Sequence, residues 1–197
     1  FHLFTANDIL PSHNRKVREK YRRILTERGI FLHLDHKIVK VEPNTITTSK
    51  DTSYELEEII WVTMASAQSW LKESGLAVSS NGFVKVHDTL ESISHPGIFA
   101  VGDIADVVNH PRPKSGVFAV RQGPPLTRNL RRALLGKPLK PYRPQRQFLS
   151  LITTGDKYAV ASRSNWAAEG KLFWHWKNWI DRRFIRKFNE LRDMDEE

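Results

Sequence analysis

A short apolar run that ends in Gly-Asp is the feature of this chain that most restricts its fold. Residues 98–101 (Ile-Phe-Ala-Val) form the run, and turn residues bound it on both sides. The pattern predicts a buried strand, after which Gly102 lets the backbone approach another group closely. Asp103 would then stand at the carboxyl end of the strand, the edge of an open α/β sheet where ligands bind. A carboxylate there accepts hydrogen bonds from sugar hydroxyls and repels a phosphate. The alternative is an ordinary turn with a solvated Asp103.

A helix is predicted a few residues later, beyond a proline-containing loop over residues 106–114. Ser115 is a suitable N-cap, and residues 116–122 form the expected helix. The free N–H groups at such a helix start suit an electron-rich carbonyl, although a core helix without a ligand has the same pattern. Pro124 and the proline after it are expected to break this helix, and a second helix is expected over residues 125–135.

The amino-terminal segments have the order strand, helix, Gly, strand. A helix over residues 15–28 separates strands at 1–5 and 30–32, and Gly29 ends it. A further strand at 36–41 and a hairpin of 44–49 with 54–56 are expected next. This order is that of the second half of a nucleotide-binding domain. The Gly-x-Gly-x-x-Gly turn that begins a complete domain is absent from the sequence.

The remaining segments follow from the same periodicities. We expect a nearly continuous apolar strand at 58–63, a short helix at 67–74 with Trp70 and Leu71 inward, and a strand at 82–86. A proline-rich connector over residues 137–146 precedes a hairpin, and a long helix ends the chain. The hairpin strands are expected at 148–153 and 158–162, and the final helix at 171–191.

Composition limits the functions that the chain can have. It has no cysteine, which excludes disulfides, thiol nucleophiles and Cys-ligated metals within it. The net charge of +9 would suit nucleic acid or an anionic membrane. No helix-turn-helix, zinc or aromatic-platform pattern accompanies that charge, so we do not expect nucleic-acid binding. No metal site or catalytic acid or base is predicted, and neither a signal peptide nor a membrane-spanning segment is expected.

The predicted final helix is amphipathic, with bulky apolar residues on one face and Lys and Arg on the other. This combination is typical of a helix that lies on an anionic membrane surface. The residues expected to contact the membrane are Phe173, Trp176, Ile180 and Phe184. A core helix or a dimer-forming helix with snorkelling basic side chains has the same pattern, and both alternatives stay open.

The Gly-Asp run and its surroundings resemble a flavin-binding motif of the pyridine nucleotide-disulphide oxidoreductases, in particular the type II NADH dehydrogenases. The residues that carry the resemblance are Thr89, the run at 98–101, and Gly102-Asp103. By this resemblance Gly102 and Asp103 bind FAD, the carboxylate through the ribityl chain. The N–H groups of the helix start at Gly116, Val117 and Phe118 would face the pyrimidine ring of the flavin.

The resemblance extends to residues 119–123 (Ala-Val-Arg-Gln-Gly), whose Gln122 corresponds to a glutamine that contacts quinone in the type II enzymes. An amide can donate to a quinone carbonyl without introducing a charge. Alternatively, Gln122 caps or hydrates the helix end. Residues 149–162 and 176–184 resemble more closely the flavoprotein module fused to selenide, water dikinase. One departure is Met64, which stands where the family has a Gly.

The resemblance implies an α/β, partial FAD/NAD(P)-binding fold with a carboxy-terminal hairpin and amphipathic helix. It divides the chain into 1–56 (second half of the NAD(P)-binding domain), 57–140 (carboxy-terminal half of the FAD-binding domain) and 141–197 (hairpin and helix). Because both glycine-rich turns lie outside it, we expect the carboxy-terminal portion of a longer enzyme that is inactive by itself.

The implied activity is electron transfer from NAD(P)H through FAD to a quinone or another acceptor. The expected location is the cytoplasm, with peripheral contact at the inner face of the membrane. A homodimer is among the expected assemblies. The alternative function is a non-catalytic nucleotide-fold module that binds a membrane surface or a partner.

Overall fold

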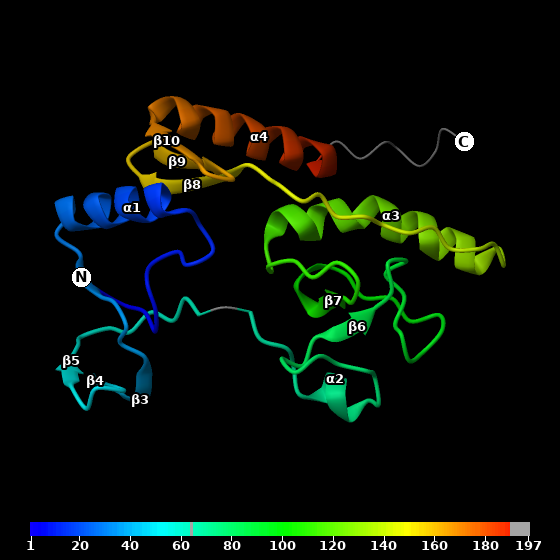
Figure 1. Ribbon diagram of the computed structural model, residues 1–197, viewed down its shortest axis with the longest axis horizontal. Helices are drawn as coiled ribbons and strands as arrows, with labels where there is room; N and C mark the ends of the chain where they lie inside the picture. The colour runs from blue at the N-terminus through cyan, green and yellow to red at the C-terminus, as the bar shows by residue number, and fades with distance from the viewer. Residues whose placement is uncertain (64, 190–197) are drawn as a thin grey trace. The chain divides into compact units, whose positions relative to one another are not determined.

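The computed structural model describes residues 1–63 and 65–189, which divide into two compact units (Figure 1). The first unit contains Phe1–Ile60 and the carboxy-terminal segment that starts at Gln147, and the second contains Trp61–Arg146. Both combine helices with short strands, so the expected α/β class is confirmed. Met64 and the last residues of the predicted tail helix lie outside the described part of the chain.

The first unit begins with the predicted strand–helix–strand order. Strands β1 (His2–Phe4) and β2 (Phe31–His33) are parallel neighbours, and α1 (Arg15–Glu27) connects them. The predicted hairpin is also confirmed, as part of a three-stranded antiparallel sheet. Its strands are β3 (Ile38–Glu42), β4 (Thr45–Thr48) and β5 (Ser53–Glu55).

The start and the buried face of α1 follow directly from its sequence. Asn14 is the N-cap, and its side-chain oxygen accepts a hydrogen bond from the Val17 amide at 3.1 Å. Val17, Tyr21 and Ile24 recur at helical spacing and are buried. They form one core cluster with Val160, which comes from the carboxy-terminal part of the same unit.

A three-stranded antiparallel sheet, in the order β10-β9-β8, supplies that carboxy-terminal part. β8 (Ser150–Gly155) and β9 (Tyr158–Arg163) are the predicted hairpin. β10 (Trp166–Gly170) was not predicted, because Gly and Ala give residues 166–170 little strand signal. The final helix is α4 (Lys171–Asn189), which follows β10 without a loop.

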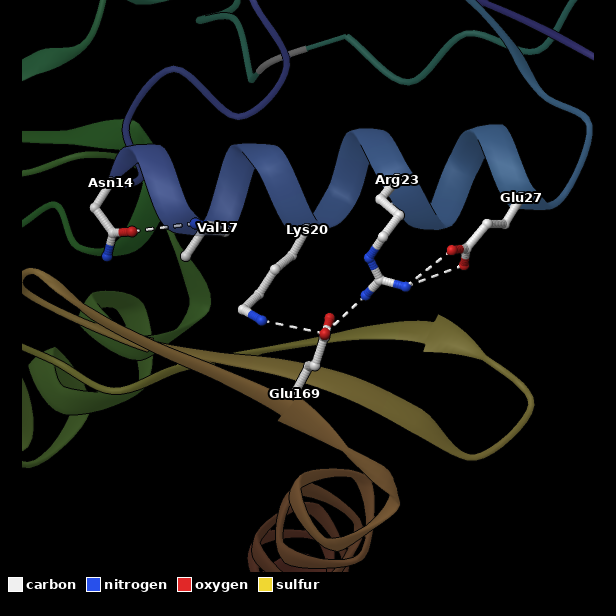
Figure 2. Close-up of polar contacts among 6 residues, drawn as sticks. All are labelled: Asn14, Val17, Lys20, Arg23, Glu27 and Glu169. Atoms are coloured by element: carbon white, nitrogen blue, oxygen red, sulfur yellow. Dashed lines mark hydrogen bonds and ion pairs between the residues drawn. The ribbon is translucent and has the colours of Figure 1, made fainter.

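Charged side chains join α1 to this sheet, as Figure 2 shows. Glu169 of β10 accepts hydrogen bonds from Lys20 at 3.1 Å and from Arg23 at 2.7 Å. Arg23 also bonds both carboxylate oxygens of Glu27, one helical turn later. The Asn14 side-chain nitrogen donates to the carbonyls of residues 164 and 166. Segments far apart in the sequence therefore share one core and one polar seam.

The second unit is built on a short parallel pair of strands, β6 (Val84–Val86) and β7 (Ala105–Val107). Its helices are α2 (Trp70–Glu73), the single 3₁₀ turn η1 (Gly102–Ile104) and α3 (Gly116–Leu134). The buried core consists of small and branched apolar side chains from these elements and the loops between them. They are Leu71, Val84, Val86, Leu90, Ala100, Ala105 and Val107.

Two strand predictions are wrong. Residues 58–63 form no strand, because no described strand pairs with them. Ile60, Trp61 and Val62 are exposed, at 79%, 58% and 79%. Residues 98–101 form only an isolated bridge, because their backbone bonds return to the loop at 90–92. The strand of this region is β7 instead, so Asp103 precedes a strand rather than ending one.

Two helix predictions also need correction. The helix predicted at 67–74 shortens to α2, in which Leu71 is buried as expected but Trp70 is 58% exposed. The predicted break at Pro124 does not occur, since α3 continues through both prolines. Buried side chains on either side of the prolines hold the two halves against the unit: Phe118 and Gln122 before them and Asn129 after them.

Candidate functional site

An open hollow in the second unit brings together residues from η1, β7, the following loop and the first turns of α3. Four of the residues singled out from the sequence line it: Gly102, Asp103, Phe118 and Gln122. Gly116 and Val117 lie on the same first turn of α3 but are not part of its lining. The Gly-Asp turn therefore lies close to the start of α3, as predicted.

Gly102 has a left-handed backbone, with φ of +70°, and this conformation permits the turn into η1. Its amide donates to the side-chain oxygen of Gln122, which is only 6% exposed. Asp103 comes next and is exposed at the hollow. Its carboxylate has no hydrogen bond or ion pair to any described residue, so its acceptor sites are available to a ligand.

The start of α3 offers two free backbone donors. Ser115 has an extended backbone (φ −159°, ψ 150°) and occupies the N-cap position, but its hydroxyl makes no cap bond. Its carbonyl accepts from the Phe118 and Ala119 amides at 3.0 and 3.2 Å. The Gly116 and Val117 amides have no acceptor among the described residues, as expected for the first turn of a helix. The Phe118 amide, expected to face a ligand, is therefore used within the turn.

A cation balances the carboxylates around the hollow. The Lys114 amine donates to the Ala105 carbonyl at 2.5 Å and lies 4.1 Å from the centre of the Phe83 ring. Burial lowers the pKa of the Lys114 amine, and the carboxylates of Asp106 and Asp103 partly oppose that shift. The site thus combines acceptors, backbone donors and one partly desolvated positive charge.

Sequence reasoning predicted the loop at 106–114 but assigned none of its charged residues to the site. Besides Lys114 and Asp106, His110 and Arg112 line the hollow. The His110 ring lies 3.6 Å from the Asp88 carboxylate, and the Arg112 side chain donates to the Gln145 carbonyl at 3.3 Å. Alternating prolines and cations over 110–114 were the available signal. Among the described residues, no group of three or more His, Asp and Glu side chains could hold a metal ion.

The predicted membrane residues lie on α4, in the first unit. Trp176, Ile180 and Phe184 are 44%, 39% and 37% exposed, whereas Phe173 is half-buried with its ring 6.0 Å from that of Trp166. Phe173 therefore packs on β10, and the exposed apolar face lies further along the helix. None of the helices within 1–63 and 65–189 has both the length and the apolar character needed to cross a bilayer.

Parallel strands joined by a helix, and a hollow at a turn beside a helix start, are typical of nucleotide-binding α/β proteins. The sequence profile of the pyridine nucleotide-disulphide oxidoreductases matches residues 2–123, and the chain belongs to this family. Proteins of the family bind FAD and NAD(P)H.

Named relatives agree with this assignment. Ferroptosis suppressor protein 1 of Taeniopygia guttata is 28% identical over 148 residues, which cover 70% of this chain and 38% of that protein. Type II NADH:quinone oxidoreductase of Haemophilus influenzae is 26% identical over 152 residues, covering 75% and 32%. The chain thus spans between about a third and two fifths of the length of these relatives.

The fold itself is shared with solved structures. The sulfide:quinone oxidoreductase from Aquifex aeolicus superposes with a TM-score of 0.74 at 14% identity, over 95% of this chain and 49% of that one. The partial FAD/NAD(P)-binding fold expected from the sequence is therefore confirmed. The closer likeness to the module fused to selenide, water dikinase stays a prediction.

Proposed function

We propose that this chain is the carboxy-terminal portion of an FAD-dependent NAD(P)H oxidoreductase that delivers electrons to a quinone or another acceptor. Family membership supports an oxidoreductase, and two of the similar proteins, a type II NADH:quinone oxidoreductase and a sulfide:quinone oxidoreductase, favour a quinone acceptor. The observation that carries the proposal is the hollow in the second unit, which joins Asp103 to the α3 start.

Residues that line the hollow, together with the neighbouring first turn of α3, fit the flavin end of FAD. The unpaired Asp103 carboxylate can accept from ribityl hydroxyls, and the free Gly116 and Val117 amides can donate to a carbonyl of the flavin ring. The buried Phe118 side chain supplies an apolar wall. When bound, FAD supplies hydride and electron transfer, while the protein orients the cofactor and sets its electrostatic surroundings.

The site is incomplete for the rest of the cofactor. The sequence contains no Gly-x-Gly-x-x-Gly turn for a pyrophosphate. We therefore expect this stretch alone to hold FAD weakly and to be inactive. The proposed division keeps 1–56 as part of an NAD(P)-binding domain, 57–140 as part of an FAD-binding domain, and 141–197 as hairpin and helix.

For the electron acceptor, we propose that the amide NH₂ group of Gln122 donates to the quinone. The side-chain oxygen of Gln122 accepts from the Gly102 amide, so the NH₂ group is the end available to a quinone carbonyl. Because Gln122 also lines the hollow, such a donor would stand beside the flavin-binding residues.

For the membrane, the proposal uses the exposed face of α4. Its apolar residues Trp176, Ile180 and Phe184 are accompanied by other exposed apolar side chains: Leu172, Trp179, Ile185 and Phe188. Arg182, Arg183, Arg186 and Lys187 belong to the same exposed part of the helix. Rings at headgroup depth and cations beside anionic lipid would hold such a helix at the surface, where quinones are available.

The flavin proposal is tested on the purified full-length protein by its visible absorbance and by the ratio of FAD to protein. Asp103→Ala should lower FAD retention about tenfold, the loss expected when charge-assisted hydrogen bonds are removed. Glu73→Ala is the matched control, because Glu73 is an exposed carboxylate of the same unit that does not line the hollow. A colourless wild-type protein that gains no flavin from added FAD would favour the non-catalytic module instead.

The membrane proposal is tested by sedimentation with vesicles of phosphatidylcholine and phosphatidylserine. Replacing Trp176, Ile180 and Phe184 together by Ser should release the protein into the supernatant. The control changes the exposed His175 to Ser on the same helix. Equal sedimentation of the triple variant and the wild type would show that α4 does not contact lipid.

A further inference from the structure

Gln122 is a buried polar residue of α3 whose side chain accepts a hydrogen bond from a backbone amide of η1. It is 6% exposed, and its side-chain oxygen accepts from the Gly102 amide, twenty residues earlier in the chain. A buried primary amide needs such partners, since an unpaired one is costly. The bond therefore connects α3 to η1 within the second unit.

The Gly102 amide needs this acceptor as much as Gln122 needs the donor. Gly102 lies at φ +70° at the start of η1, outside β7, so the strand pairing of β6 and β7 does not include its amide. A β-carbon at Gly102 would lie 3.6 Å from that of Ala119, which is an ordinary contact. Ala119 precedes Gln122 by three residues and hence shares its helix face. The turn and α3 thus approach closely on one face, where the Gly102–Gln122 hydrogen bond joins them.

The orientation of Asp103 depends on that turn. Asp103 is the next residue, and its carboxylate has no hydrogen bond or ion pair to the described residues that could fix its direction. Glycine can adopt either sign of φ, so the left-handed conformation at Gly102 must be selected by its surroundings. Among the residues that the structure describes, the side-chain contact that fixes the Gly102 amide is the oxygen of Gln122.

We infer that Gln122 is a positioning residue, which holds the Gly102 turn so that the Asp103 carboxylate faces the bound ligand. This inference rests on the proposed function for the identity of that ligand, a ribityl-bearing flavin. It assigns the two ends of the Gln122 amide separately: the oxygen holds the turn, and the NH₂ group lies at the hollow. Only the first role is needed for cofactor retention.

Three substitutions in the full-length protein separate these roles. Gln122→Met keeps the volume and removes the acceptor, whereas Gln122→Glu keeps an oxygen acceptor and removes the NH₂ group. Asn129→Met is the matched control, because Asn129 is a buried amide of the same helix. Its bonds go to Thr89 and Lys140, and it does not line the hollow.

The first readout is hydrogen exchange at the Gly102 amide, which does not depend on any ligand. Gln122→Met should speed that exchange about tenfold relative to the wild type, while Gln122→Glu should stay within about threefold. Asn129→Met should leave the local protection of Gly102 unchanged while lowering the melting temperature. Unchanged exchange in Gln122→Met would overturn the inference at its first step.

The second readout is the Kd for FAD, followed by flavin fluorescence. Gln122→Met should raise it about tenfold, Gln122→Glu should restore it to within about threefold, and Asn129→Met should not change it. Equal weakening by Met and Glu would overturn the positioning role, because the acceptor alone would not restore binding. If the wild type binds no FAD, the proposed function and the ligand part of this inference both fail. The exchange experiment still decides whether Gln122 holds the turn.

Discussion

Pro124 lies in the middle of α3, where a helix is least tolerant of proline. An α-helix needs a donor at residue 124 for the Val120 carbonyl, and proline has none. Replacing an interior proline by alanine restores this bond and removes the clash of the proline ring with the preceding turn, a gain of about 3 kcal/mol in helix propensity. The unfolded chain loses the proline restraint, which offsets about 0.4–1 kcal/mol of that gain. We therefore expect Pro124→Ala to stabilise α3 by about 2 kcal/mol.

Hydrogen exchange of peptides from residues 116–134 measures the effect directly, since it reports the free energy of local opening. A gain of about 2 kcal/mol slows exchange roughly thirtyfold. Gly123→Ala is the matched control. A β-carbon there meets nothing within 4 Å, so it should gain only the helix propensity of Ala over Gly, about 1 kcal/mol.

One result would refute the reasoning. If Pro124→Ala slows exchange no more than Gly123→Ala, the missing donor does not limit the stability of α3. Pro124 is exposed, so removal of its ring should cost little packing and should not mask the gain.

Two further predictions concern a strained turn and a histidine. Gly102→Ala should lower the free energy of unfolding of the second unit by about 1–2 kcal/mol, because a side chain at φ +70° is strained even though space is available; urea unfolding measures this, and full stability would contradict a left-handed turn. His33 should make the first unit less stable in acid. Burial, followed by the charges of His2 and His36, lowers the pKa of its imidazole below the ordinary value. The unfolded chain therefore takes up the proton first, so stability is complete above about pH 7 and falls as the pH drops through 6.5. In His33→Phe the urea midpoint should depend less on pH between about pH 7 and pH 5 than in the wild type. An unchanged pH dependence of the midpoint would assign the effect to other groups.

Elements with a strong local signal were predicted correctly from the sequence. The apolar spacing of Val17, Tyr21 and Ile24, with Gly29 after it, predicts α1 because each of these residues acts within a few positions. The hairpins follow from alternation around polar turns. The proximity of Asp103 to the α3 start was also predicted, through a resemblance to a family motif.

The failures share a physical origin in contacts that the local pattern does not contain. Residues 98–101 have a strand composition, but their backbone donors and acceptors bond the loop at 90–92. The predicted helix break at Pro124 was wrong because both halves of α3 bury side chains against the unit, Phe118 before the prolines and Asn129 after them. The Lys114 charge at the hollow was missed because its significance depends on Ala105 and Phe83, which precede it in the chain.

The first unit combines Phe1–Ile60 with the segment that starts at Gln147, and this has a consequence for biosynthesis. Val17, Tyr21 and Ile24 leave the ribosome well before Val160, which completes their cluster and is translated only after the whole of Trp61–Arg146. Closing so long a loop costs entropy and slows the step that depends on it. The apolar face of α1 therefore stays exposed on the nascent chain while Trp61–Arg146 is synthesised. During this interval the chain is most prone to aggregate and most in need of a chaperone.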